Sequence, residues 1–178
     1  MKNFKALTLA ALAAFTTIAA PAAEARGTYA EHTQLGNAVR ATGITLKFNP
    51  AECRTKNAMG WYWAAKREMV ICQENHKGYV GFGQEVRWTE EDLDTLRHEA
   101  QHLIQDCMAG RRQGSLDSVY NEPIELAKSI LGSEGIAYIL KIYAEASDHI
   151  KVMELEAFSV AEMNDPAEQA RDIAKYCF

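Results

Sequence analysis

Residues 89–108, TEEDLDTLRHEAQHLIQDCM, form the stretch around which the rest of the chain is organised. Thr89 is a favourable N-cap, and Asp92 stands three residues later, where its side chain can return a hydrogen bond to the cap backbone. Gly110 follows the stretch, and glycine commonly ends a helix. These signals predict a helix from about Glu90 to Ala109.

The predicted helix has an apolar stripe and a separate face that carries two histidines. Apolar residues recur along it at helical spacing, as is typical of a face that packs on a core. They are Leu93, Leu96, Ala100, Leu103 and Cys107. His98 and His102 lie off this stripe, so the core does not account for them.

The residues on either side of this helix differ in character. Before it, Ile44–Phe48 alternates like a strand, and two β-prone runs, 61–63 and 69–72, predict a hairpin around residues 64–68. After it, start and stop signals predict helices over about 122–132, 133–146, 148–163 and 165–176, and a weaker pattern predicts a first helix near 29–39. The predicted class is α+β, with a small N-terminal sheet, the central helix and a mostly helical C-terminal half.

Composition excludes two classes of protein. The chain has 178 residues, 48% of them hydrophobic, and a net charge of -5, which suits one domain with its own core. The acidic balance provides no basic stripe for nucleic acid. Outside the N-terminus, no apolar run approaches the roughly 20 residues that cross a bilayer, so we expect no membrane insertion of the exported domain.

Residues 1–25 have the pattern of an export signal. A short basic start precedes an Ala/Leu-rich stretch to Ala20, and the small-x-small pattern Ala23-Glu24-Ala25 follows, which favours cleavage before Arg26. We therefore expect a signal peptide over 1–25, a single domain over 26–178, and a secreted or periplasmic protein.

The four cysteines fit this environment. All lie after the predicted signal, and an even count in an oxidising compartment predicts two disulfides. Three pairings are possible. We favour Cys53 with Cys72, which closes a local loop, and Cys107 with Cys177, which ties the chain end to the central helix.

The central helix contains the motif H-E-x-x-H as His98-Glu99-Ala100-Gln101-His102. Histidines four residues apart lie about 40° apart around a helix, so both imidazoles can bind the same metal ion. A catalytic zinc ion (Zn²⁺) takes three protein ligands and keeps a position for water, and the glutamate of this motif can accept a proton from that water. His98 and His102 are the predicted ligands, and Glu99 is the predicted general base.

The sequence downstream resembles one class of zinc peptidase and differs from another. In metzincins the motif continues to a glycine and a third histidine, but Gln105 and Met108 occupy those positions. Glu156-Ala157-Phe158-Ser159 resembles the E-A-x-S segment that supplies a glutamate ligand in thermolysin-like gluzincins. The resemblance implies a zincin-like fold and a zinc metallopeptidase of the gluzincin type.

This resemblance makes Glu156 the expected third zinc ligand, with Glu154 and Glu162 as rivals. Glu154 and Glu156 lie about 200° apart around a helix, so both cannot face one metal ion. Val160 stands where the resembled enzymes have an aspartate that supports a ligand. Asp106, one turn after His102, is a candidate for that supporting role.

The stabiliser of the reaction's oxyanion is less defined by sequence. His149 is seven residues before Glu156 and so lies on the same helix face, which makes it the expected catalytic partner of Glu99. Tyr143 and Tyr120 are alternatives.

These residues predict an exported zinc-dependent peptidase that acts on a peptide or protein substrate. The Trp/Tyr-rich hairpin is a candidate edge strand for an extended substrate. Two other functions remain open: a catalytically silent zincin-fold protein with a binding or structural role, and a zinc amidase acting on cell-wall peptides. The sequence does not indicate an oligomeric state.

Overall fold

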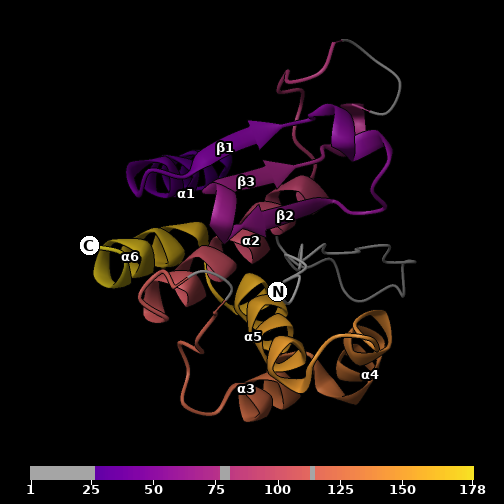
Figure 1. Cartoon of the computed structure of the whole chain (residues 1–178), viewed down its shortest axis with the longest axis vertical. Coiled ribbons are helices and arrows are strands. Elements are labelled where there is room, and N and C mark those ends of the chain that lie inside the picture. Colours follow the sequence, from indigo (N-terminus) through magenta and orange to yellow (C-terminus); the bar gives the residue numbers. More distant parts are fainter. Residues whose placement is uncertain (1–26, 77–80, 113–114) are drawn as a thin grey trace, which may run out of the picture.

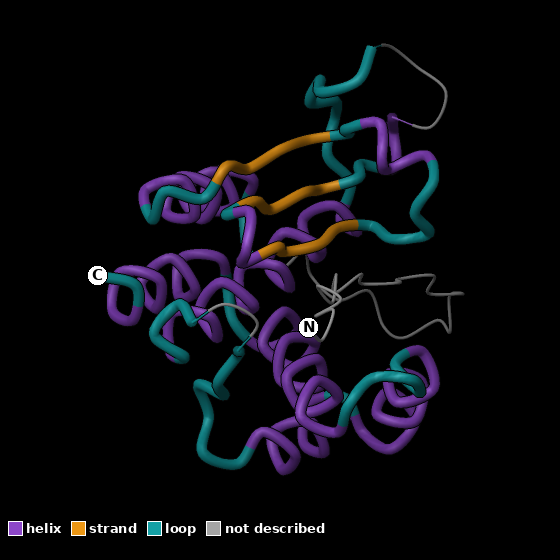
Figure 2. The backbone as a smooth tube through the Cα atoms, viewed as in Figure 1, coloured by secondary structure: helices purple, strands orange, loops and turns teal. Residues whose placement is uncertain are grey.

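The computed structural model describes residues 27–76, 81–112 and 115–178. Within these ranges the fold is α+β, with one small sheet and a mostly helical remainder (Figures 1 and 2). The predicted signal peptide, residues 1–25, lies outside the described residues. The predicted class is therefore confirmed in its coarse form.

The sheet consists of β1 (Thr45–Phe48), β2 (Gly60–Trp63) and β3 (Glu68–Ile71), in the order β1-β3-β2. β2 and β3 form the predicted antiparallel hairpin, and β1 pairs with β3 in parallel. Short 3-10 helices follow each strand: Ala51–Arg54, Ala64–Lys66 and Glu74–His76. β2 is thus an edge strand of the sheet.

The described residues contain six α-helices, of which α1 and α2 pack against the sheet. They are α1 (Tyr29–Ala41), α2 (Glu90–Met108), α3 (Pro123–Ile130), α4 (Gly132–Ile142), α5 (Asp148–Met163) and α6 (Pro166–Tyr176). Two predicted details are wrong. The helix expected to reach Ala146 ends at Ile142. From the sequence we also expect Asp148 to cap the helix over 148–163, but the cap of α5 is Ser147, whose hydroxyl accepts from the Ile150 amide.

α2 runs through the centre of the molecule and has apolar neighbours on two sides (Figure 1). Its N-terminus forms the predicted capping box of Thr89 and Asp92. Leu96, Ala100 and Leu103 pack in a core with residues of α1, the sheet and α6. A second core lies among α3, α4 and α5, formed by Ala127, Ile139, Tyr143, Leu155 and Phe158. The faces of α2 and α5 that meet lie between these two cores.

Both predicted disulfides are present, Cys53–Cys72 and Cys107–Cys177, and no cysteine is free. The second one joins the end of α2 to the residue after α6. Two disulfides indicate an oxidising, extracytoplasmic environment. In the described ranges, no helix has both the length and the apolar character needed to cross a bilayer.

Loss of the Cys107–Cys177 bridge should destabilise the fold more than loss of Cys53–Cys72. The first spans 70 residues and the second 19, and a longer closed loop removes more entropy from the unfolded chain. The double alanine variants should lower the free energy of unfolding by about 4 and about 3 kcal/mol respectively. Urea denaturation without reductant measures both, and the reverse ranking would contradict this account.

Candidate metal centre

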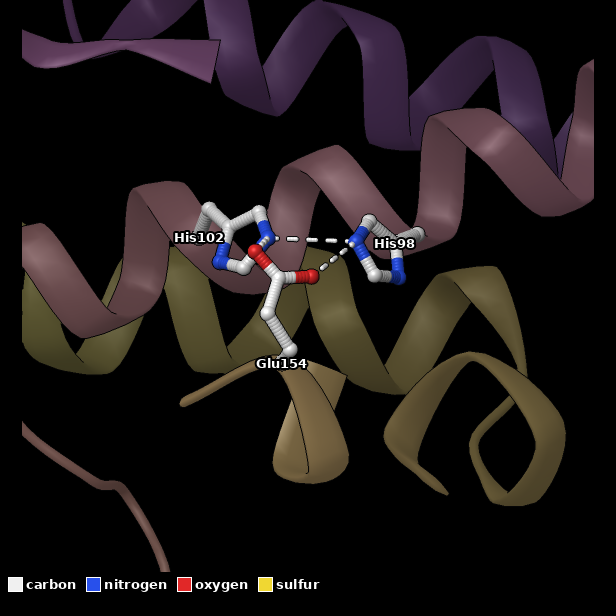
Figure 3. A group of neighbouring side chains, drawn as sticks. All are labelled: His98, His102 and Glu154. Carbon is white, nitrogen blue, oxygen red and sulfur yellow. Dashed lines mark hydrogen bonds and ion pairs between the residues drawn. The ribbon is translucent and has the colours of Figure 1, made fainter. Parts of the chain in front are cut away.

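Three buried side chains from two helices converge between the cores (Figure 3). α2 contributes His98 and His102, which are 2% and 1% exposed, and α5 contributes Glu154, which is fully buried. The Nε2 atoms of the two histidines are 3.1 Å apart. Glu154 Oε2 lies 3.3 Å from His98 Nε2, and Glu154 Oε1 lies 3.5 Å from His102 Nε2.

These separations fit a metal ion held by all three residues. Ligands about 2.0 to 2.1 Å from a tetrahedral zinc ion are about 3.3 Å from one another. The three observed distances bracket that value. Two imidazole nitrogens and a carboxylate also form a donor set that zinc accepts in catalytic sites. The geometry and the chemistry of the group both suit a divalent metal.

Glu154 and His102 shift one another's pKa values in favour of their charged forms. Burial alone would raise the pKa of Glu154, but the neighbouring His102 and His98 hold it below its ordinary value. Burial alone would lower the pKa of His102, but Glu154 raises it above its ordinary value. The carboxylate is therefore ionised, as a metal ligand must be.

Glu99 lies beside this group and is 1% exposed. Neither of its carboxylate oxygens makes a hydrogen bond of ordinary geometry among the described residues, although the Tyr62 backbone amide of β2 comes close enough to lower its pKa. Burial raises the pKa of Glu99 to about 7, against the opposing effect of His98 and His102. A carboxylate with a pKa near neutrality suits a general base.

The edge strand β2 passes directly over Glu99. A Cβ atom added to Gly60 would lie 3.3 Å from Glu99 Cγ and 2.6 Å from Thr95 Cγ2. Only glycine allows this approach without displacing α2. The start of β2 and the central helix are therefore in close contact at the predicted base.

The structure brings Glu154 beside the two histidines, whereas Glu156, the expected third ligand, has other partners. Its carboxylate accepts hydrogen bonds from Gln101 Nε2 and Gln105 Nε2, both at 3.0 Å. It also accepts from Ser118 Oγ and from the backbone amides of Val119 and Tyr120. Glu156 thus holds the segment before α3 against α2. Glu162, the other rival, is exposed.

Gln105, and not Asp106, is the residue that contacts and orients a candidate metal ligand. The Gln105 side-chain amide donates to Glu156 and to the Met153 carbonyl, so its oxygen Oε1 is left to accept from His102 Nδ1 at 2.8 Å. When a metal binds, His102 must give up its Nε2 proton, and this bond would keep the remaining proton on Nδ1 and hold the ring in place. Asp106 instead accepts a hydrogen bond from the Tyr62 hydroxyl at 2.7 Å.

Replacing Gln105 with leucine should weaken zinc binding by about 10- to 100-fold, the usual cost of losing a partner that orients a metal-binding histidine. Titration of the metal-free protein against a zinc-buffered indicator measures this affinity. Gln84→Leu serves as the control, because the Gln84 side chain is exposed in the loop that precedes α2. Unchanged affinity in Gln105→Leu would remove its positioning role.

His149, the predicted oxyanion stabiliser, is not at the centre. Its Nε2 atom lies 2.8 Å from the Leu116 carbonyl, so it fixes a loop. Tyr143 is the alternative that does lie near the group: burial, Glu154 and Glu99 all raise its pKa well above its ordinary value. Tyr120 contacts Asn164 instead.

One further contact was not predicted. The Phe158 ring packs on the His98 imidazole with centroids 4.3 Å apart. His98 Nδ1 has no hydrogen-bond partner among the described residues, so packing orients this ring whereas Gln105 orients His102. The sequence signal for Phe158 is its position four residues after Glu154, on the same helix face.

The fold and the site together define an α+β protein with a candidate His-His-Glu metal centre on two packed helices. The chain belongs to the family described as "Domain of unknown function (DUF8637)", which it matches over residues 28–178. No curated protein and no solved structure matches it.

Proposed function

We propose that this protein is an exported zinc-dependent peptidase of a zincin-like, gluzincin type, with Glu154 as its third metal ligand. One observation carries the proposal: Glu154 faces both histidines of H-E-x-x-H at zinc-ligand spacing, while Glu99 of the same motif is buried beside them. A metal site with a purely structural role needs only its ligands. A buried glutamate beside the ligands, such as Glu99, suits the general base of a catalytic site.

Zinc in such a site supplies Lewis acidity and lowers the pKa of a coordinated water to about 7. Glu99 accepts the proton of the attacking water and passes it to the leaving amine. The Tyr143 hydroxyl donates a hydrogen bond to the Glu154 carboxylate, and we propose that it exchanges this bond for one to the developing oxyanion, as the candidate in place of His149.

The position of β2 supports a peptide as the substrate. β2 is an edge strand that begins at Gly60, against Glu99. An extended peptide can add to such an edge through backbone hydrogen bonds, which would bring its carbonyl groups toward the base.

Burial of the centre favours a second candidate. His98, His102, Glu99 and Glu154 are each at most 2% exposed, which also suits a metal-binding protein that does not turn over substrate. The two functions differ in hydrolysis and agree on metal binding.

Digestion of a mixed peptide library tests the proposal. The purified protein, incubated with the library and analysed by mass spectrometry, should produce cleavage products that disappear with 1,10-phenanthroline and return when zinc is restored. Peptides with D-amino acids, as in cell walls, belong in the library and identify an amidase. The His98→Ala variant is the matched control. A zinc-loaded protein that cleaves no library member would favour the non-catalytic candidate.

A further inference from the structure

A cavity of about 420 Å³ lies at one end of the sheet, apart from the candidate metal centre. The chain enters it just after β1 and β3 and just before β2, so three strand ends border the same space. Its lining consists of Asn49, Cys53, Arg54, Lys56, Asn57, Ala58, Met59, Cys72, Gln73 and His76.

The walls of this cavity are fixed by bonds that do not depend on a ligand. The Asn49 amide donates to Gln73 Oε1 and to the Gln84 carbonyl, and Asn49 Oδ1 accepts from the Gln73 backbone amide. Gln73 donates to the Val86 carbonyl and accepts from the Val86 amide. The Cys53–Cys72 disulfide joins two sides of the cavity. Asn49 and Gln73 therefore have their hydrogen-bonding groups engaged in the wall.

The lining also includes two cations, the exposed Arg54 and the half-buried Lys56. Arg54 stacks over Phe82 at 4.2 Å, and Lys56 stacks over Trp61 at 4.2 Å. Within the described ranges, neither cation forms an ion pair with a carboxylate, and no Asp or Glu lines the cavity. Aromatic stacking orients both cations and leaves them without a carboxylate partner among the described residues.

A third group completes the cavity's polar surface. His76 is 6% exposed, and its Nε2 atom has no hydrogen-bond partner in the described part of the chain. A buried polar atom without a partner costs free energy unless something binds it. A ligand in the cavity is a natural partner for this nitrogen.

We propose that this cavity is a binding site for the anionic group of a small ligand, a carboxylate or a phosphate, held by Arg54, Lys56 and His76. Guanidinium and ammonium groups bind such anions with charge-assisted hydrogen bonds. The apolar part of the ligand would lie against Ala58 and Met59. The site goes beyond the proposed function, because it uses none of the candidate metal ligands.

The anionic group can come from a free small molecule or from an acidic side chain of a peptide. The second source is structurally accessible, because Met59 lines the cavity and the next residue, Gly60, contacts Glu99. An acidic residue bound here would place its peptide near the start of β2. The test must therefore separate the two sources.

Isothermal titration of the purified protein with four probes tests the site: succinate, inorganic phosphate, the blocked peptide acetyl-Ala-Glu-Ala-amide, and its glutamine analogue. At least one anionic probe should bind saturably, and the glutamine peptide should not. Binding of the glutamate peptide identifies an acidic side chain as the ligand, whereas binding of succinate or phosphate alone identifies a free anion. No saturable binding of any anionic probe would overturn the proposal.

Paired variants locate the binding. Arg54→Gln with Lys56→Gln should weaken it by about tenfold or more, because two charge-assisted contacts are lost. Lys128→Gln with Lys175→Gln removes the same charge from exposed positions and should leave it unchanged. His98→Ala should also leave it unchanged. Equal weakening by both pairs would show a general charge effect and would overturn the assignment to this cavity.

Discussion

Zinc affinity should fall by more than about 100-fold when Glu154 is replaced with glutamine, since even the loss of a ligand's supporting partner costs about 10- to 100-fold. The side chain keeps its shape but loses the negative charge that faces His98 and His102 at 3.3 and 3.5 Å. The competition assay with a zinc indicator measures this loss directly. Because the substitution preserves volume in a buried position, we expect the fold to remain.

Glu156→Gln is the matched control, two residues away on the same buried helix. The Glu156 carboxylate accepts hydrogen bonds from several donors. In Glu156→Gln one oxygen becomes an NH₂ group that faces a donor and cannot accept from it, so the free energy of unfolding should fall by about 1 to 3 kcal/mol. Zinc affinity should fall by no more than about tenfold, through the effect on Gln105. Loss of zinc in Glu156→Gln with retention in Glu154→Gln would reverse the ligand assignment.

Replacing Glu99 with glutamine should abolish most hydrolysis while the metal stays bound. Proton transfer by a positioned base contributes about 100- to 10,000-fold to a rate, and glutamine cannot accept a proton. The value of kcat should therefore fall within that range. Zinc stoichiometry should match the unmodified protein, because Glu99 is not among the residues that face the metal position.

Glu134→Gln is the control for this variant, since Glu134 is an exposed glutamate on α4. It should leave both kcat and zinc content unchanged. A Glu99→Gln protein that retains full activity would contradict the proposed mechanism, and one that loses zinc would show that Glu99 helps to hold the metal.

The central helix and its motif could be predicted because their signals are local. Thr89, Asp92 and the apolar stripe of α2 lie within a few turns of one another, and both histidines share one face whatever surrounds the helix. The hairpin was predictable for the same reason. Both cysteine pairings followed from a choice among only three.

The third ligand could not be predicted from local signals, because the sequence of α5 does not separate a buried face from an exposed one. Every residue from Met153 to Ala161 is buried, so both Glu154 and Glu156 lie in the interior, with different partners. A rule that the ligand faces inward does not separate them. The donors that hold Glu156 include backbone amides of a distant loop, which no helical periodicity reveals.

The supporting contacts show the same limit. Gln105 and Asp106 both lie about one turn after His102, and only the packing of α5 on α2 decides that Gln105 contacts the histidine. His149 shares a helix face with Glu156. Because that face is not the one that carries Glu154, His149 also lies away from the two histidines and contacts the Leu116 carbonyl. The choice of His149 as oxyanion stabiliser therefore rested on the choice of Glu156 as ligand, and neither side chain lies beside the two histidines in the structure.

The central claim is that His98, His102 and Glu154 hold zinc, and X-ray absorption at the zinc edge of the purified protein tests it most directly. We predict one zinc ion per chain with two imidazoles and only nitrogen and oxygen ligands, at about 2.0 to 2.2 Å. No sulfur should appear, since all cysteines are in disulfides. A protein that retains no zinc, or a spectrum without histidine ligands, would contradict the claim.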